Sequence, residues 1–291
     1  ESAGRKLLVT EPVEQYEGHA VFCERAGSLP RLVICGGGHV SIPMIRMGKM
    51  LGFQVTVLED RPKFADNARV AGADVVICDS FEHGLERISG GEDTYFIIVT
   101  RGHRYDEVCL GAIVEKPNAY IGMMGSRRRV AIVKEELFEQ GHEREKLDEV
   151  YTPIGLKIGA ETPEEIAVSV MAEIIQVKHE KAEGCGYSKE LLEALCDEDG
   201  KKQKKVLATI ISRKGSAPRG VGTKMLILED GTLIDTIGGG CAESDVITKA
   251  LLMMREEKVR FQICMVDMTR EAAEEEGMVC GGRIEVMLER V

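Results

Sequence analysis

The chain is poor in positive charge and has no long apolar run, and both shortages exclude classes of function. Its 38 Lys and Arg residues are outnumbered by 49 Asp and Glu residues, which gives a formal net charge of −11. Nucleic acids and anionic membranes require a basic face, so we expect neither as a partner. No apolar stretch approaches the roughly 20 residues of a membrane span, and residues 1–15 lack a signal-peptide apolar region. We therefore expect a soluble, cytoplasmic protein.

Tryptophan is absent and aromatic residues make up only 4% of the chain, yet the composition is typical of a globular protein. Hydrophobic residues account for 44% and charged residues for 30%. A chain of 291 residues is long enough for two domains with separate cores. We therefore expect two domains.

The nine cysteines include no C-x-x-C pair, so a zinc ribbon is not expected, and we assign no metal ligands. Their odd number and the missing secretion signal also argue against a disulfide framework. Five cysteines in apolar runs are expected to be buried: Cys23, Cys35, Cys78, Cys109 and Cys264. Cys241 and Cys280 differ because they lie beside glycines.

Residues 31–60 predict a strand, a glycine turn, a helix and a second strand. The apolar run Arg31–Cys35 is typical of a buried parallel strand, and the three glycines at 36–38 end it. A helix is expected over His39–Leu51, and the next strand over Gln54–Leu58. This order predicts a Rossmann-type opening.

The glycine turn matches most of the dinucleotide-binding pattern G-x-G-x-x-G. Gly36 and Gly38 fit the first two glycines, and Ser41, which is still small, replaces the third. His39 adjoins the turn, and Glu59 follows the second strand, where dinucleotide folds hold the ribose hydroxyls. We expect these residues to contact a nucleotide, with NAD preferred over NADP because Glu59 would repel a 2′-phosphate. The alternative is a Rossmann scaffold that binds nothing.

Strands and helices continue to alternate as far as residue 123. Short apolar runs at Ala73–Cys78, Tyr95–Thr100 and Ala119–Met123 are separated by helix-compatible segments. This pattern predicts a doubly wound α/β sheet of parallel strands, whose ligands bind beyond the carboxyl ends of the strands. The first 30 residues are expected to add an edge hairpin to this sheet.

Two of the segments that follow these strands are unusually polar. Ser126 is expected to cap a helix, which places Arg127 and Arg128 beside free backbone N–H groups, an arrangement suited to an anion. A solvated first turn is the alternative. His103 and Asp106 can form an acid–base pair on one turn, or His103 can be a structural hydrogen bonder.

A change of composition marks the domain boundary. Residues 178–205 are rich in charge and contain no β-branched residue. We expect a Rossmann-like domain over residues 1–180, a linker with a short helix over 181–204, and a smaller α+β domain over 205–291. Thr162–Glu165 is a capping box that predicts the helix closing the first domain.

The second domain is expected to consist of strands around one helix. The expected elements are strands at Val206–Ser212, Lys224–Leu228, Thr232–Ile237, Val259–Asp267 and Arg283–Glu289, and a helix from Gly238 to Glu256. Cys241 lies where a glycine turn meets this helix, and the free N–H groups there favour thiolate over thiol. Cys280 lies in a second glycine-flanked turn. Packed turn residues are the alternative for both.

Several motifs recur in a known family. The second domain contains GSAPRGVGTKM at Gly215–Met225, DTIGGGCAE at Asp235–Glu243 and GMVCGG at Gly277–Gly282. The first contains CGGGHV at Cys35–Val40, VTRGHRYDE at Val99–Glu107, YIGMMGSRRR at Tyr120–Arg129 and PIGLKIGAETPEEIAVS at Pro153–Ser169. Together they resemble the xanthine dehydrogenase accessory factor family, XdhC/CoxI, over nearly the whole chain. Typical members place the GSAPR domain first, whereas here it follows the Rossmann domain.

The resemblance implies a maturation factor. Such a protein binds the molybdenum-pterin cofactor, supports its sulfuration by a cysteine desulfurase, and delivers it to a molybdenum hydroxylase client. It implies Cys241 and Cys280 as the thiols that handle cofactor or sulfur. The cofactor contacts that it implies in this domain are Gly215, Ser216, Arg219, Gly239, Gly240 and Glu243. We also expect a homodimer.

Two other functions fit the same residues. One is an NAD(P)-dependent oxidoreductase in which His103 and Asp106 supply the proton. The other is a nucleotide sensor whose Rossmann domain regulates delivery.

Overall fold

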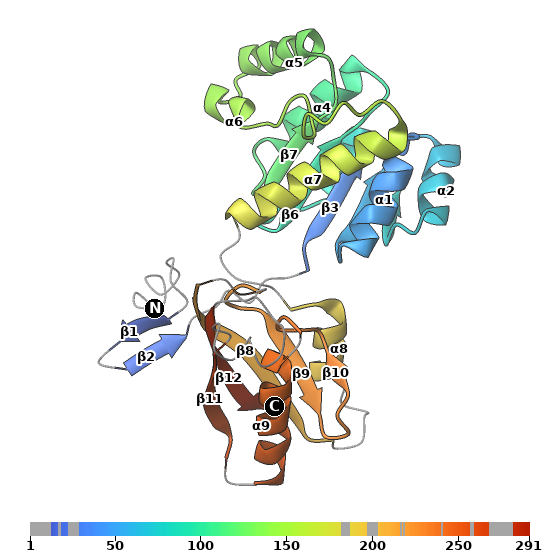
Figure 1. Ribbon diagram of the computed structural model, residues 1–291. Helices are drawn as coiled ribbons and strands as arrows, with labels where there is room; N and C mark the ends of the chain where they lie inside the picture. The colour runs from blue at the N-terminus through green and yellow to red at the C-terminus, as the bar shows by residue number, and fades with distance from the viewer. Residues whose placement is uncertain are drawn as a thin grey trace. The chain divides into compact units, whose positions relative to one another are not determined.

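The computed structural model describes most of the chain as two compact units (Figure 1). The described residues are 13–16, 19–22, 29–181, 187–196, 203–215, 217, 219–239, 241–256, 259–267 and 282–291. The first unit is Ser28–Ala182, and the second combines Glu1–Gly27 with Glu183–Val291. The domain limits expected from composition stay a prediction.

The first unit is built on five parallel strands in the order β5-β4-β3-β6-β7. The strands are β3 (Arg31–Cys35), β4 (Gln54–Leu58), β5 (Val75–Ile77), β6 (Thr94–Ile98) and β7 (Tyr120–Met123). The predicted doubly wound sheet is therefore confirmed. The chain winds in opposite directions from β3, so the loop after β3 lies at the switch point where such sheets bind ligands.

Helices cover both faces of this sheet. They are α1 (Ser41–Met50), α2 (Pro62–Val70), α3 (Phe81–Glu86), α4 (His103–Ile113), α5 (Arg127–Glu139), α6 (Arg144–Asp148) and α7 (Pro163–Lys181). Val33 and Cys35 of β3 pack into a core with α3, α4 and α5, whereas Leu32 and Ile34 pack into a core with α1 and α7. Successive strand side chains point to opposite faces, which explains why the apolar run is continuous.

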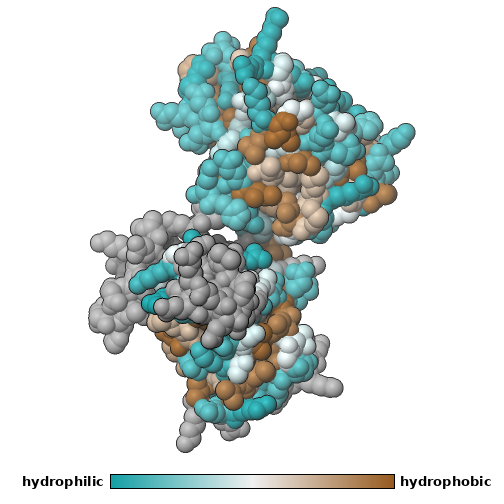
Figure 2. All heavy atoms as spheres, viewed as in Figure 1, coloured by the Kyte–Doolittle hydropathy of each residue, from teal (hydrophilic) through white to brown (hydrophobic). Residues whose placement is uncertain are grey.

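Helix α7 begins as the capping box predicts. The Thr162 hydroxyl accepts from Glu165 N at 3.3 Å, and Glu165 Oε2 accepts from Thr162 N at 3.0 Å. Its inner face is buried against the sheet, while Val168 and Ile175 on its outer face are 46% and 36% exposed. Figure 2 shows apolar residues gathered over this helix.

The second unit contains an antiparallel sheet of order β10-β9-β8-β12-β11. Its strands are β8 (Lys205–Lys214), β9 (Lys224–Leu228), β10 (Leu233–Ile234), β11 (Phe261–Asp267) and β12 (Arg283–Arg290). Helix α9 (Cys241–Arg255) packs Val246 and Ala250 against one face. Helix α8 (Lys189–Cys196) packs Leu191 on Leu207 and Leu226 of the other. The predicted α+β unit is thus present.

Two expectations from the sequence are wrong. Strands β1 (Val13–Tyr16) and β2 (His19–Phe22) pair with each other and, among the described residues, do not extend the parallel sheet. Cys78 is exposed because it follows the end of β5, an edge strand that neighbours cover on one side only. Cys35, Cys109 and Cys264 are buried as predicted, and Cys23 lies outside the described residues. No described helix is both long and apolar enough to cross a membrane.

Candidate functional site

The glycine turn after β3 is shaped by two close contacts. Gly36 has a φ of +116°, and a Cβ there would lie 2.5 Å from the Val99 carbonyl oxygen, so only glycine fits. Ser41, in place of the third glycine, donates from its buried hydroxyl to the Gly36 carbonyl at 2.5 Å. At Gly38, in contrast, a Cβ would meet nothing within 4 Å. The backbone is therefore open to a ligand at Gly38, beside the exposed His39.

The side chain of Glu59 stabilises this glycine turn. Its side chain is 1% exposed, and Oε2 accepts from the backbone N–H of Gly37 at 2.6 Å. Oε1 accepts from Nε of Arg61 at 2.7 Å. Both carboxylate oxygens thus have partners within the protein, which gives Glu59 a structural role in the turn. Its contact with a ribose stays a prediction.

An ion pair bridges the strands on either side of β3. Arg101, after β6, donates from Nη1 and Nη2 to the two carboxylate oxygens of Asp60, after β4, at 2.5 and 2.7 Å. The Arg101 hydrogen bonds lower the pKa of Asp60 from its ordinary value. Arg101 also donates to the Tyr105 hydroxyl at 2.5 Å. Because β4 and β6 flank β3, this bridge lies at the same edge of the sheet as the glycine turn.

His103 and Asp106 have different partners. Asp106 is buried, accepts from the Thr100 hydroxyl at 2.5 Å and pairs with Arg129. Burial raises the pKa of Asp106, and the interactions with Thr100 and Arg129 oppose that rise. His103 Nε2 lies 3.4 Å from Glu136 Oε2. The acid–base pair considered from the sequence is therefore not formed.

Ser126 caps α5, as predicted, by accepting from the backbone N–H of Arg129 at 3.3 Å. Arg127 and Arg128 are exposed, whereas the Arg129 side chain turns toward Asp106. An anion contact by Arg127 or Arg128 stays a prediction.

In the second unit, Glu243 organises the turn that leads into α9. Its Oε1 accepts from the backbone N–H groups of Ile237 at 3.1 Å and Gly239 at 2.9 Å, and from the Thr236 hydroxyl. Burial raises the pKa of Glu243, but these hydrogen bonds outweigh it, so the pKa lies below its ordinary value. A Cβ at Gly239 would meet nothing within 4 Å. The turn is held in shape and its backbone is open, with Cys241 as the first residue of α9.

Strand register directs three connections toward one end of the antiparallel sheet, and two of them leave it at the same level. Lys214, the last residue of β8, pairs with Arg283, and Arg283 pairs with Asp267, the last residue of β11. The β8–β9 and β11–β12 connections therefore both leave the sheet at this end. Strand β10 runs toward the same end and leads into the turn before α9, but its last residue, Ile234, is level with Leu226 and Leu207, seven residues before Lys214.

The candidate residues of the second unit lie in these connections and in the first turn of α9. Gly215 has a φ of +80°, and Arg219 is exposed. Ser216, Gly240 and Cys280 lie outside the described residues, as does the side chain of Cys241. The register thus gives the direction in which the segments leave the sheet, while the contacts of these residues stay predictions.

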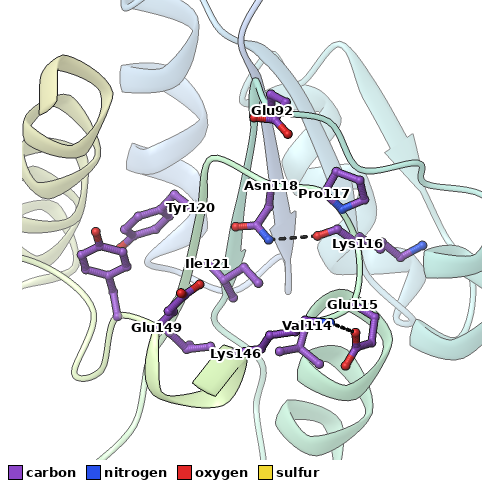
Figure 3. Close-up of a pocket in the computed structure, with 12 residues that line it drawn as sticks. Glu92, Val114, Glu115, Lys116, Pro117, Asn118, Tyr120, Ile121, Lys146 and Glu149 are labelled. Atoms are coloured by element: carbon purple, nitrogen blue, oxygen red, sulfur yellow. Dashed lines mark hydrogen bonds and ion pairs between the residues drawn. The ribbon is translucent and has the colours of Figure 1, made fainter. Parts of the chain in front are cut away.

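A cavity of about 390 Å³ lies elsewhere in the first unit, at the amino end of β7 (Figure 3). Glu115, Lys116, Lys146 and Glu149 contribute to its lining. Lys146 pairs with Glu115, and Lys116 donates to the carbonyls of Leu85 and Ile88, so the lysines are already engaged. None of the candidate residues lines it. Parallel sheets bind ligands at the opposite edge, so we do not assign the cofactor to this cavity.

The fold and the glycine turns define a two-domain protein with a Rossmann domain and a small α+β domain. Residues 32–174 match the XdhC Rossmann domain, and residues 200–264 match the XdhC and CoxI family. The chain therefore belongs to the XdhC family, with its domains in the predicted order. This family is associated with xanthine dehydrogenase maturation.

Individual relatives match about half of the chain. "Uncharacterized protein YqeB" of Escherichia coli K12 is 34% identical over 55% of this chain and 29% of its own length. A protein of Bacillus subtilis 168 that is named as a probable xanthine dehydrogenase subunit is 32% identical over 54% of this chain and 46% of its own length. A crystal structure described as a xanthine dehydrogenase from Bacillus halodurans is 29% identical, covers 54% of this chain and 45% of its own, and has a TM-score of 0.48. The matched part thus spans less than half of these relatives.

Proposed function

We propose that the chain is a maturation factor that binds the molybdenum-pterin cofactor, supports its sulfuration and inserts it into a xanthine dehydrogenase-like hydroxylase. A cysteine desulfurase and the hydroxylase client are its proposed partners. The observation that carries the proposal is that the three connections with the family's motifs all leave the antiparallel sheet of the second unit toward the same end. Family membership over both domains supports the same role.

The described part of this end fits an anionic, phosphate-bearing ligand. A Cβ at Gly220 or Gly239 would meet nothing within 4 Å, so a ligand can approach the backbone there, although the N–H of Gly239 already donates to Glu243. The N-terminus of α9 adds backbone N–H groups that have no acceptor within the helix, together with the positive end of the helix dipole. Gly215, Ser216, Arg219, Gly239 and Gly240 would hold the cofactor, and Glu243 would keep the turn in position. The bound cofactor supplies the molybdenum chemistry that the client uses.

Cys241 and Cys280 are the proposed sulfur-handling thiols. A thiol at the head of a helix is stabilised as thiolate by the dipole and the free N–H groups. Cys241 occupies that position as the first residue of α9. We therefore expect it to alkylate faster at neutral pH than the other cysteines.

In the first unit, we propose NAD or a related nucleotide as the ligand of Gly36, Gly38 and His39, with Ser126 and Arg127 binding an anion. The nucleotide would regulate delivery. The oxidoreductase alternative has less support because His103 and Asp106 do not form a pair. Saturable nicotinamide turnover with a small substrate would favour that alternative.

Reconstitution tests the proposed role. The cofactor-free client is mixed anaerobically with isolated cofactor, a cysteine desulfurase and this chain, and recovered hydroxylase activity is measured. The wild-type chain should raise recovery, and Cys241→Ala should lower it. The matched control is Cys196→Ala, because Cys196 is an exposed cysteine of the same unit away from the glycine turns. Equal recovery with and without the chain would contradict the proposal.

A further inference from the structure

Three metal-binding side chains converge between α4 and α5. His103 and Glu107 are four residues apart, which places them on one face of α4, and Glu136 projects from α5. One ligand atom from each lies within 4.8 Å of the others, and no second such group occurs among the described residues. The sequence did not reveal this cluster because Glu136 is distant along the chain.

The contact between His103 and Glu136 is not a hydrogen bond. Nε2 and Oε2 lie 3.4 Å apart, yet both atoms are shielded from solvent and neither has a hydrogen-bond partner. Buried polar atoms without partners are uncommon and costly, which indicates that these two are arranged for another ligand. If one ion lay about 2.1 Å from each of these two atoms, which are 3.4 Å apart, the ligand–ion–ligand angle would be about 108°, close to the tetrahedral angle of zinc sites.

A second histidine–glutamate pair in the same unit is hydrogen-bonded and so differs from the contact between His103 and Glu136. His142 Nδ1 makes a hydrogen bond with Glu115 at 3.5 Å, and Lys146 also pairs with Glu115. In the part of the chain that the structure describes, no lysine or arginine pairs with Glu136. His103, which faces the Glu136 carboxylate, balances its charge only when the imidazole is protonated, so a divalent cation can take that role.

The third side chain, that of Glu107, is already held in position by a hydrogen bond. Gln140 Nε2 donates to Glu107 Oε1 at 2.7 Å, the kind of outer hydrogen bond that positions a ligating carboxylate. The three side chains are half-buried. One imidazole and two carboxylates suit zinc and similar divalent ions and leave at least one coordination position open.

We propose that His103, Glu107 and Glu136 bind one divalent transition-metal ion, of which Zn²⁺ is the best fit. The ion joins the start of α4 to α5. Since α4 follows β6, the site lies near the edge of the sheet where the glycine turn is found. The open position is available to an oxygen or sulfur atom of a bound ligand.

Titration of the metal-free full chain with Zn²⁺ and Co²⁺ tests the site. The chain is first dialysed against a chelator, and binding is followed by calorimetry and, for Co²⁺, by visible absorption. We expect one site with the intense absorption of four-coordinate Co²⁺ and no thiolate charge-transfer band, because no cysteine is a ligand. His103→Ala and Glu136→Gln should each weaken binding about a hundredfold, and Gln140→Ala about tenfold.

His142→Ala is the matched control and should bind both ions as the wild type does. Circular dichroism of each variant checks the fold, and Glu136→Gln preserves side-chain shape if His103→Ala fails to fold. Unchanged affinity in Glu136→Gln, or a thiolate band that persists in every variant, would overturn the site. Absence of binding by the wild type would mean that the contact is a histidine–glutamate ion pair only.

Discussion

Replacement of Glu59 by alanine should destabilise the first unit before any ligand binds. The substitution leaves the buried N–H of Gly37 without its acceptor, which costs about 1–3 kcal/mol. It also removes the ion pair with Arg61, whose side chain is 35% exposed, so this loss falls below the value for a fully buried pair. We expect a total of about 2–3 kcal/mol, and about 1 kcal/mol for Glu59→Gln, which keeps an acceptor for Gly37.

Urea unfolding of the full chain, followed by circular dichroism, measures this loss. In thermal unfolding, about 2 kcal/mol should appear as a fall of about 4–8 °C for a unit of this size. Asp66→Ala is the control because Asp66 and Arg69 form a similar pair with side chains 70% and 49% exposed, which should contribute under about 0.5 kcal/mol. If Glu59→Ala loses no more stability than Asp66→Ala, Glu59 does not hold the turn.

Four further predictions concern ligands and pH. Cys241→Ala and Cys280→Ala should impair cofactor binding or sulfuration without shifting the unfolding midpoint; normal client maturation by both variants would exclude the thiol role. Calorimetry should find NAD bound more tightly than NADP because of the charge of Glu59, and the reverse order would contradict this. The lowered pKa of Glu243 makes its contribution to stability present above its ordinary value of 4.5 and lost as pH falls below it; unfolding midpoints of Glu243→Gln should lack that acid-side loss. Arg127→Ala should weaken phosphate binding to the first unit, and an unchanged affinity would remove Arg127 from the site.

The sequence predicted the elements that hydrophobic period and turn chemistry determine. The run Arg31–Cys35, the glycine turn and the capping box at Thr162 each depend on neighbouring residues, and each is present. Burial of Cys78 was predicted wrongly because an apolar run does not show which strand lies at the edge of the sheet. Local patterns therefore give the elements but not their order across the sheet.

The site was less predictable because its contacts join distant positions. Arg101 and Asp60 are 41 residues apart, and their pairing follows only from the position of β4 and β6 on either side of β3. Similarly, sequence position predicted Glu59 as a ribose contact, which stays a prediction, and did not reveal the hydrogen bond by which Glu59 holds the glycine turn. In the second unit, the end of the sheet toward which the motif-bearing connections leave depends on strand register, which sequence motifs alone do not provide.

Anaerobic binding of the isolated molybdenum-pterin cofactor to the purified chain, measured beside NAD and NADP under the same conditions, tests the maturation role most directly. We predict saturable, stoichiometric binding of the pterin cofactor that Cys241→Ala weakens and Cys196→Ala does not. Binding of NAD in addition is compatible with a regulatory Rossmann domain. No binding of the pterin cofactor, together with saturable nicotinamide turnover, would contradict the proposed function.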